Sequence, residues 1–180
     1  MTGTIMPIYD KIAALMRTRD WKACHAFLDG ALVDADADQR KSAHLWRAFV
    51  LEREGRYDEA IDCWRRRRNE FNCQTMVDHQ IARLYDQSGH ATQAIEELRA
   101  SPFGDEMDRH PALVLDGVYF YCWLLAREGR DVPEKLLNTL PDDFMFVQPR
   151  GNRTSKGAVA VADRHARRQV ESGRESRDLI

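Results

Sequence analysis

The sequence lacks the glycine-rich and nucleophile motifs on which many enzymes depend, and it lacks a long apolar run. Its 180 residues include 10 glycines, and they form no P-loop, no GxGxxG and no GxSxG. The most apolar stretch, Val118–Ala126, is far shorter than the roughly 20 residues that a membrane-spanning helix needs, so a buried helix is the better interpretation. The start of the chain has no secretory signature. We therefore expect a cytoplasmic protein that does not cross a membrane and is not an enzyme.

Cysteine is scarce and the net charge is small. The chain has four cysteines, Cys24, Cys63, Cys73 and Cys122, and no pair of them has the close spacing of metal ligands. We expect plain reduced thiols, no metal and no cofactor. The formal net charge of −2 gives no global attraction to nucleic acid or to an anionic membrane. With 43% hydrophobic and 31% charged residues, the composition is that of a globular domain.

Two segments in the middle of the chain repeat each other. Leu45–Trp64 aligns with His79–Leu98 at a shift of 34 residues, which places Gly55 on Gly89. The shift also superposes small or apolar pairs: Ala48 on Ala82, Ala60 on Ala94, and Ile61 on Ile95. Small residues allow two helices to approach closely, and glycine permits the positive φ of a tight turn. Each segment is therefore predicted to be a pair of short antiparallel helices.

This pattern resembles the tetratricopeptide repeat (TPR) family, both in its period and in the segment Gly55–Ile61. A weaker unit precedes it: the turn at Arg19–Trp21 lies 36 residues before Gly55 and has no glycine. Another follows, with Gly129 lying 40 residues after Gly89. The resemblance implies an all-α fold, a right-handed solenoid of about four TPR-like helix-turn-helix hairpins over residues 5–140.

The rest of the chain, residues 141–180, is predicted to be a C-terminal extension. It begins with a short strand or strap at Phe144–Val147, and Ser155 precedes a weak helix over about Ala158–Val170. A mobile tail is expected at Ser172–Ile180. From Arg150 onward the chain is basic, with eight Lys or Arg against four Asp or Glu.

Two further segments carry specific expectations. Asp131 and Glu134 are predicted to cap a helix over Pro133–Leu140. Residues 101–111 contain prolines and a glycine at breaker positions and are predicted to be a long loop, either an ordinary connection or one that carries contacts.

No motif for metal or acid–base chemistry is complete. Asp34–Asp38 has the alternating acidic residues that open an EF-hand loop, but Gln39 and Leu45 occupy the positions that need glycine and glutamate. A solvated loop before the next helix is the better interpretation. The acidic residues at positions 105–108 and 142–143 have no nucleophile or metal ligand beside them.

In TPR arrays the first helix of each hairpin lines a concave groove, and the resemblance carries this role to nine residues. They are aromatic, cationic or imidazole side chains, the types that dominate binding hot spots: Trp46, Phe49, Arg53, His79, Arg83, Tyr119, Phe120, Trp123 and Arg127. The alternative for each aromatic is packing against the next hairpin or the strap. The Lys/Asn carboxylate clamp of some family members cannot form, because Leu45 and Phe49 occupy positions that would carry it.

The sequence thus predicts a protein–protein interaction module that binds its partner in the groove. An adaptor, a secretion-chaperone-like protein or a toxin-neutralising immunity-type protein of a bacterium would suit it, and the partner segment would be helical or extended, acidic and apolar. The alternative is a nucleic-acid or phosphate-binding accessory protein that uses Arg65–Arg68 and the basic tail. Four consecutive helical residues wrap around the axis without forming a stripe, so we expect an ion-paired helix end and no nucleic-acid partner.

Overall fold

The structure, a computed structural model, describes residues 8–33, 37–142, 145–146 and 153–175. The fold is all-α, as predicted, and its two short strands have two residues each. The chain forms two compact units, Met1–Asn72 and Cys73–Ile180, which we call unit 1 and unit 2. The two units divide the segment that was predicted to be one repeat array, and a single solenoid stays a prediction.

Unit 1 contains two helical hairpins. Its elements are α1 (Ile8–Arg17), α2 (Trp21–Val33), α3 (Ala37–Glu54), α4 (Tyr57–Arg67) and the 3-10 helix η1 (Arg68–Glu70). The helix α3 packs against α1 and α2 of the first hairpin and against its own partner α4. A core of fully buried residues joins the first three helices: Ile12, Cys24, Leu28, Ala43 and Val50.

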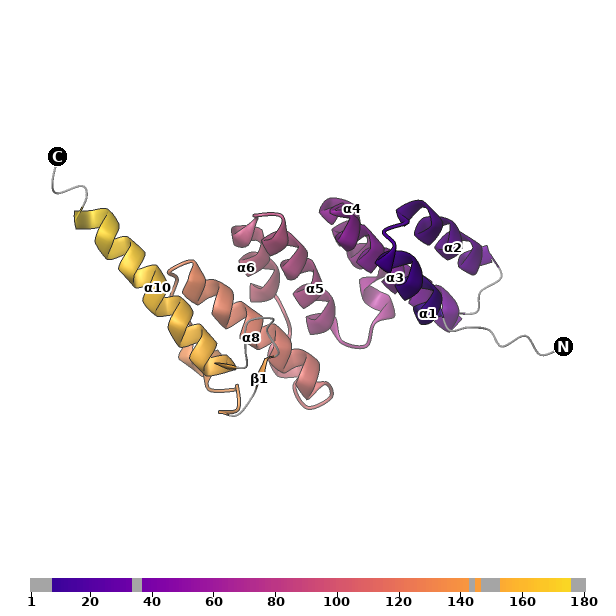
Figure 1. The fold of residues 1–180 in the computed structure, drawn as a ribbon. Coiled ribbons are helices and arrows are strands. Elements are labelled where there is room, and N and C mark those ends of the chain that lie inside the picture. Colours follow the sequence, from indigo (N-terminus) through magenta and orange to yellow (C-terminus); the bar gives the residue numbers. More distant parts are fainter. Residues whose placement is uncertain (1–7, 34–36, 143–144, 147–152, 176–180) are drawn as a thin grey trace. The chain divides into compact units, whose positions relative to one another are not determined.

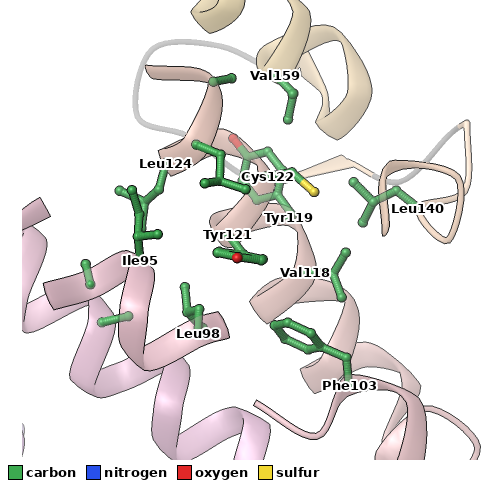
Figure 2. Close-up of a cluster of buried hydrophobic side chains, with 14 of the residues drawn as sticks. Ile95, Leu98, Phe103, Val118, Tyr119, Tyr121, Cys122, Leu124, Leu140 and Val159 are labelled. Carbon is green, nitrogen blue, oxygen red and sulfur yellow. The ribbon is translucent and has the colours of Figure 1, made fainter. Parts of the chain in front are cut away.

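Unit 2 is built around α8 (Pro111–Arg127). The preceding elements are α5 (Gln74–Gln87), α6 (Ala91–Arg99) and α7 (Phe103–Glu106); α9 (Glu134–Leu137), β1 (Met145–Phe146), β2 (Arg153–Thr154) and α10 (Ser155–Glu175) follow. Each of the helices α5, α6, α7, α9 and α10 contacts α8, and α10 runs alongside it (Figure 1). Figure 2 shows Ile95 and Leu98 of α6 on one side of the core and Val159 of α10 on another, with Tyr119, Cys122 and Leu124 of α8 between them.

The same turn ends four helices. A residue just after each helix has positive φ: 56° at Arg19, 82° at Gly55, 83° at Gly89 and 66° at Gly129. The next amide donates to the carbonyl five residues back, as in a Schellman motif: Asp20 to Leu15 (3.3 Å), Arg56 to Leu51 (2.9 Å), His90 to Tyr85 (2.8 Å) and Arg130 to Leu125 (2.8 Å). The predicted hairpin turns at Gly55 and Gly89 are thereby confirmed.

In the first three hairpins the second helix begins directly after this turn, but in the fourth it does not. The helix α9 has only four residues, and its N-cap, Pro133, makes no side-chain cap. The predicted helix over Pro133–Leu140 is therefore present only as the short α9, and the predicted side-chain cap by Asp131 and Glu134 is not formed. The backbone carbonyl of Pro133 accepts the amides of Leu136 and Leu137, each at 3.0 Å, but proline has no side-chain oxygen to form a cap, and Leu140 is buried in the core.

The long partner of α8 is α10. Its Val159, Ala162 and Ala166 lie on one face at helical spacing; the first two join the unit 2 core, and Ala166 lies 3.7 Å from the position of a Cβ at Gly129. The predicted final helix exists, but it is longer than expected at both ends. It includes Ser172–Glu175, which were predicted to be mobile, since a helix once packed gains a hydrogen bond with each added residue. The predicted strand is present at Met145–Phe146, which pair antiparallel with Arg153–Thr154; Phe144 and Val147 lie outside the described residues.

No helix in the described part of the chain is both long and apolar enough to cross a bilayer.

Candidate functional site

The helix α8 is apolar almost throughout, and beyond its first turn most of its partly exposed side chains lie on one face. Phe120, Trp123 and Arg127 follow one another at spacings of three and four residues, so they share a helix face. We call these three residues the α8 stripe. Residues on the other faces of α8 are buried, among them Val118, Cys122 and Leu125. The stripe therefore contains the partly exposed aromatic side chains of α8, and Leu113, seven residues before Phe120, is also exposed.

The stripe is ordered by contacts between its own members. The rings of Phe120 and Trp123 are stacked, with centroids 5.8 Å apart and an interplanar angle of 21°. The guanidinium carbon of Arg127 lies 4.7 Å from the centroid of the Trp123 ring. Such a cation–π contact contributes about 0.5–1 kcal/mol when partly exposed. The three side chains thus form one continuous row.

A carboxylate from α5 holds the end of the row. Asp86 accepts two hydrogen bonds from Arg127, at 3.1 and 2.5 Å, and the neighbouring Glu128 accepts another at 2.9 Å. Burial alone would lower the pKa of Arg127, but the hydrogen bonds to Asp86 and Glu128 outweigh it and raise the pKa. The sequence interpretation left Arg127 free for a partner's carboxylate. In the structure its charge is matched within unit 2, and its plane supports Trp123.

His79 of α5 lies beneath the other end of the stripe. Its ring centroid is 5.2 Å from that of Phe120, and the residue is only 7% exposed. Burial, reinforced by the nearby charge of Arg83, lowers the pKa of His79 to about 3, so the ring is neutral near pH 7. Its Nε2 is buried and has no hydrogen-bond partner among the described residues. His79 was predicted to face a partner, but it supports Phe120 from inside.

Tyr119 also lies in the interior. It is 1% exposed and belongs to the unit 2 core, where Figure 2 shows it beside Cys122 and Val159. Adjacent helical side chains point about 100° apart, so a helix that exposes Phe120 turns Tyr119 toward the core. The structure therefore moves Tyr119 from the predicted groove to the hydrophobic core.

Polar side chains border the stripe. Arg83 of α5 is half-buried, and its Nη1 donates to Oε1 of Gln80 at 2.7 Å. Asp116, one turn before Phe120 on α8, is also half-buried, and burial raises the pKa of its carboxyl group. An apolar centre with a polar border is the usual arrangement of a protein-binding surface.

The position of α5 depends on a buried carboxylate that the sequence did not reveal. Glu106 of α7 is 4% exposed and accepts hydrogen bonds from the amides of Gln74 (2.7 Å) and Thr75 (2.8 Å) at the start of α5. Burial would raise the pKa of Glu106, but these amides outweigh it and lower the pKa. The predicted loop at residues 101–111 is therefore wrong in part, because it contains the short helix α7 with Phe103 and Glu106 buried. Nothing distinguishes Glu106 from Asp105 and Asp108 in the sequence, so no local signal could have found it.

Unit 1 carries its own aromatic row on α3. The ring centroids of Trp46 and Phe49 are 5.6 Å apart, and Phe49 meets Trp64 of α4 edge-on at 5.9 Å. Trp46 also packs against the unit 1 core. One turn beyond Phe49, the side chain of Arg53 is exposed and forms no hydrogen bond or ion pair with the other described residues.

The arginine run at the end of α4 is ion-paired. Arg66 lies 3.7 Å from the carboxylate of Asp62, and Arg67 donates to Glu70 at 2.7 Å. Arg68 leaves the α-helix and begins η1. This arrangement agrees with the predicted solvated, ion-paired helix end.

The described residues present no obvious chemistry of another kind. No group of three His, Cys, Asp or Glu among them is placed to hold a metal, and the Asp34–Asp36 part of the acidic loop lies outside the described residues. The four cysteines are free thiols, and burial raises the pKa of each, in Cys122 to about 12. A thiol with a raised pKa is a poor nucleophile.

Neither the protein-family models nor the curated proteins nor the solved structures gave a match to this chain.

Proposed function

We propose that this protein is a cytoplasmic TPR-like interaction module that binds another protein through aromatic faces on the first helices of its hairpins. The observation that carries the proposal is the α8 stripe. Phe120 and Trp123 remain partly exposed although a core is available on the same helix, and Arg127 with Asp86 holds them in one arrangement. Ordered aromatic side chains lose little entropy on binding, and such residues dominate hot spots.

The packing pattern supports the repeat interpretation. In unit 1, α3 packs against both helices of the hairpin before it, and in unit 2, α8 packs against α5 and α6 in the same way. The shared Schellman turns give each hairpin the same reversal of direction. Both features are expected of stacked two-helix repeats.

The role that fits a small module of this kind is that of an adaptor, a secretion-chaperone-like protein or a toxin-neutralising immunity-type protein of a bacterium. A helix or extended segment with apolar side chains suits the stripe, since such ligands place two or three anchors at regular spacing. In the polar border, Arg83 would donate hydrogen bonds, Asp116 would accept them, and Gln80 could do either around these anchors.

The proposal is tested by replacing Phe120 with the photo-crosslinking residue p-benzoylphenylalanine in the full chain. After irradiation in a lysate of the source organism, one dominant protein should be attached to this position and be identified by mass spectrometry. The unmodified protein should then bind that partner in purified form, and Trp123→Ala should weaken the complex by at least about tenfold, as expected of a hot spot.

The matched control is Arg65→Glu with Arg66→Glu on α4, which changes more charge but leaves the stripe intact. The proposal is supported if this control binds the partner as the parent does and Trp123→Ala loses binding while its circular-dichroism spectrum is unchanged. A crosslinked partner whose affinity is untouched by Trp123→Ala but lost in the α4 control would reject the stripe as the site.

A further inference from the structure

Unit 1 has a cavity in which cationic and aromatic side chains meet. The cavity has a volume of about 660 Å³ and lies between α1, the first turn and α3. Its lining includes three arginines and two tryptophans: Arg17, Arg19, Arg53, Trp21 and Trp46. Both tryptophans pack against the unit 1 core, so their rings are supported from one side. We call this site the arginine–tryptophan cavity.

The positive charge of this cavity is unmatched. Arg17, Arg19 and Arg53 are exposed, and none of their guanidinium groups forms a hydrogen bond or ion pair with another described residue. The carboxylate that also lines the cavity, Glu54, is already occupied: it accepts from His25 at 3.0 Å and from Arg56 at 3.1 Å. The arginines elsewhere on unit 1 contrast with these, because Arg47, Arg56, Arg66 and Arg67 all have carboxylate partners.

The backbone conformation of Arg19 gives a second and independent indication that the arginine side chain has a function at this position. It is the only non-glycine residue with positive φ among the described residues, and it occupies the turn position that glycine fills at Gly55, Gly89 and Gly129. An L-residue in the left-handed region loses about 1 kcal/mol relative to glycine. Outliers of this kind cluster at functional sites, where the surrounding structure maintains them.

We propose that the arginine–tryptophan cavity binds an acidic segment of a partner protein, with an apolar or aromatic side chain against Trp21 and Trp46 and flanking Asp or Glu side chains on Arg17, Arg19 and Arg53. The proposal rests on the proposed function and names the partner chemistry for unit 1. Guanidinium groups pair with carboxylates in bidentate geometry, and tryptophan rings take apolar side chains in the space between them.

The charge distribution favours a discrete acidic segment over nucleic acid. Residues 1–72 contain 13 Lys or Arg and 12 Asp or Glu, so unit 1 as a whole is close to neutral. Binding to a nucleic-acid backbone depends on many phosphate contacts along an extended basic track. Three arginines around one cavity form no such track, but they can pair with a few carboxylates that lie close together in one segment.

The experiment uses the four tryptophans of the full chain as reporters. With the protein labelled with nitrogen-15, each indole N–H gives one NMR signal, which is assigned by single Trp→Phe variants. The probe is a synthetic peptide with both ends blocked, in which a central phenylalanine is flanked on each side by two glutamates. A second peptide has lysines in place of the glutamates, and blocked ends exclude capture of a terminal carboxylate.

The glutamate peptide should shift the signals of Trp21 and Trp46 and leave that of Trp64, which is 2% exposed, in place. Arg17→Gln with Arg53→Gln should weaken binding by about tenfold or more, because two charge-assisted pairs are lost. Arg19→Gly should also weaken it, although this change relieves the backbone. Arg66→Gln, which removes one charge from the exposed face of α4, should bind the peptide as the parent does.

Absence of any Trp21 or Trp46 shift with the glutamate peptide, equal shifts with the lysine peptide, or unchanged affinity in the arginine variants would each overturn the inference. Stronger shifts of the same signals by a twelve-residue oligothymidylate or by inorganic phosphate would show instead a nucleic-acid or phosphate site. Neither result would affect the crosslinks at Phe120, so the proposed function and this inference fail separately.

Discussion

Arg127 lies over the face of the Trp123 indole, with its guanidinium carbon 4.7 Å from the ring centroid, while Asp86 holds the guanidinium from the neighbouring helix. This arginine, on the proposed binding surface, therefore has a structural role within unit 2. It fixes Trp123, and through the stacked rings it fixes Phe120.

The first prediction concerns this pair. Asp86→Asn should lower the free energy of unfolding by about 1 kcal/mol, since the ion pair is partly screened by solvent, with Arg127 at 34% and Asp86 at 18% side-chain exposure. Arg127→Gln should have a similar effect, and the double variant should lose clearly less than the sum of the two. Urea denaturation of the four proteins measures this coupling. Strict additivity would mean that the two side chains do not depend on each other.

The second prediction concerns the close approach of α5, α7 and α8 at Gly117. A Cβ at this position would lie 2.8 Å from Cγ2 of Thr75 and 3.2 Å from Cε1 of Phe103. Gly117→Ala should therefore lower the melting temperature, with a loss of about 1–3 kcal/mol from overpacking. Adding Thr75→Ser, which removes the nearer methyl group, should recover part of the loss. No recovery would place the strain elsewhere.

The third prediction concerns pH. In the unfolded chain His79 takes up a proton near its ordinary pKa of 6.5, whereas in the folded protein burial lowers the pKa to about 3. The unfolded state therefore binds more protons between these values, so stability is present above about pH 6.5 and is lost as the pH falls toward 3. From about pH 6.5 to 5 the loss should be about 1.5 kcal/mol, and His79→Gln should remove it.

Thermal melts of the parent and of His79→Gln at matched pH values measure this difference. The comparison isolates His79, because His44, whose pKa is also lowered by burial, is present in both proteins. If the melting temperatures of the two proteins change in parallel between about pH 6.5 and 5, His79 is accessible to protons in the folded state.

The fourth prediction compares substitutions in two of the turns that end helices, at Gly89 and at Arg19. Gly89 has φ of 83°, and a Cβ at this position would meet no atom of a neighbouring element within 4 Å, so Gly89→Ala introduces backbone strain without a clash. It should reduce stability by about 1 kcal/mol. Arg19→Gly, at φ of 56°, should act in the opposite direction and stabilise by up to about 1 kcal/mol. A lower stability of Arg19→Gly would mean that the arginine side chain supports the fold. The positive φ of Arg19 would then no longer indicate a function.

The parts of this structure that follow from the sequence are those in which one residue type has one local consequence. Gly55 and Gly89 predict positive φ at a fixed distance from each other, and both turns are present. The α8 run is predicted to be a buried helix because its apolar residues leave few positions for solvent, and it becomes the centre of unit 2.

The remaining features depend on partners that are distant in the sequence. Arg127 meets Asp86 across 41 positions, and Glu106 meets Thr75 across 31, so neither pairing leaves a local pattern. The sequence also predicted a fourth hairpin, in which the helix after Gly129 pairs with the helix before it. The helix α9 has only four residues, and the alanine and valine face of α10, though weak in apolar content, packs against α8 as its long partner. Small side chains favour close helix approach, which a count of large apolar residues does not detect.

The carboxylate of Glu106 has a dynamic consequence for the start of α5. The first amides of a helix have no intrahelical acceptor and ordinarily exchange with solvent deuterium quickly. Those of Gln74 and Thr75 are bonded to Glu106, so they exchange only when α7 moves away. Their exchange rates should therefore rise and fall with those of the α7 amides, so that two segments some thirty residues apart open as a single cooperative unit.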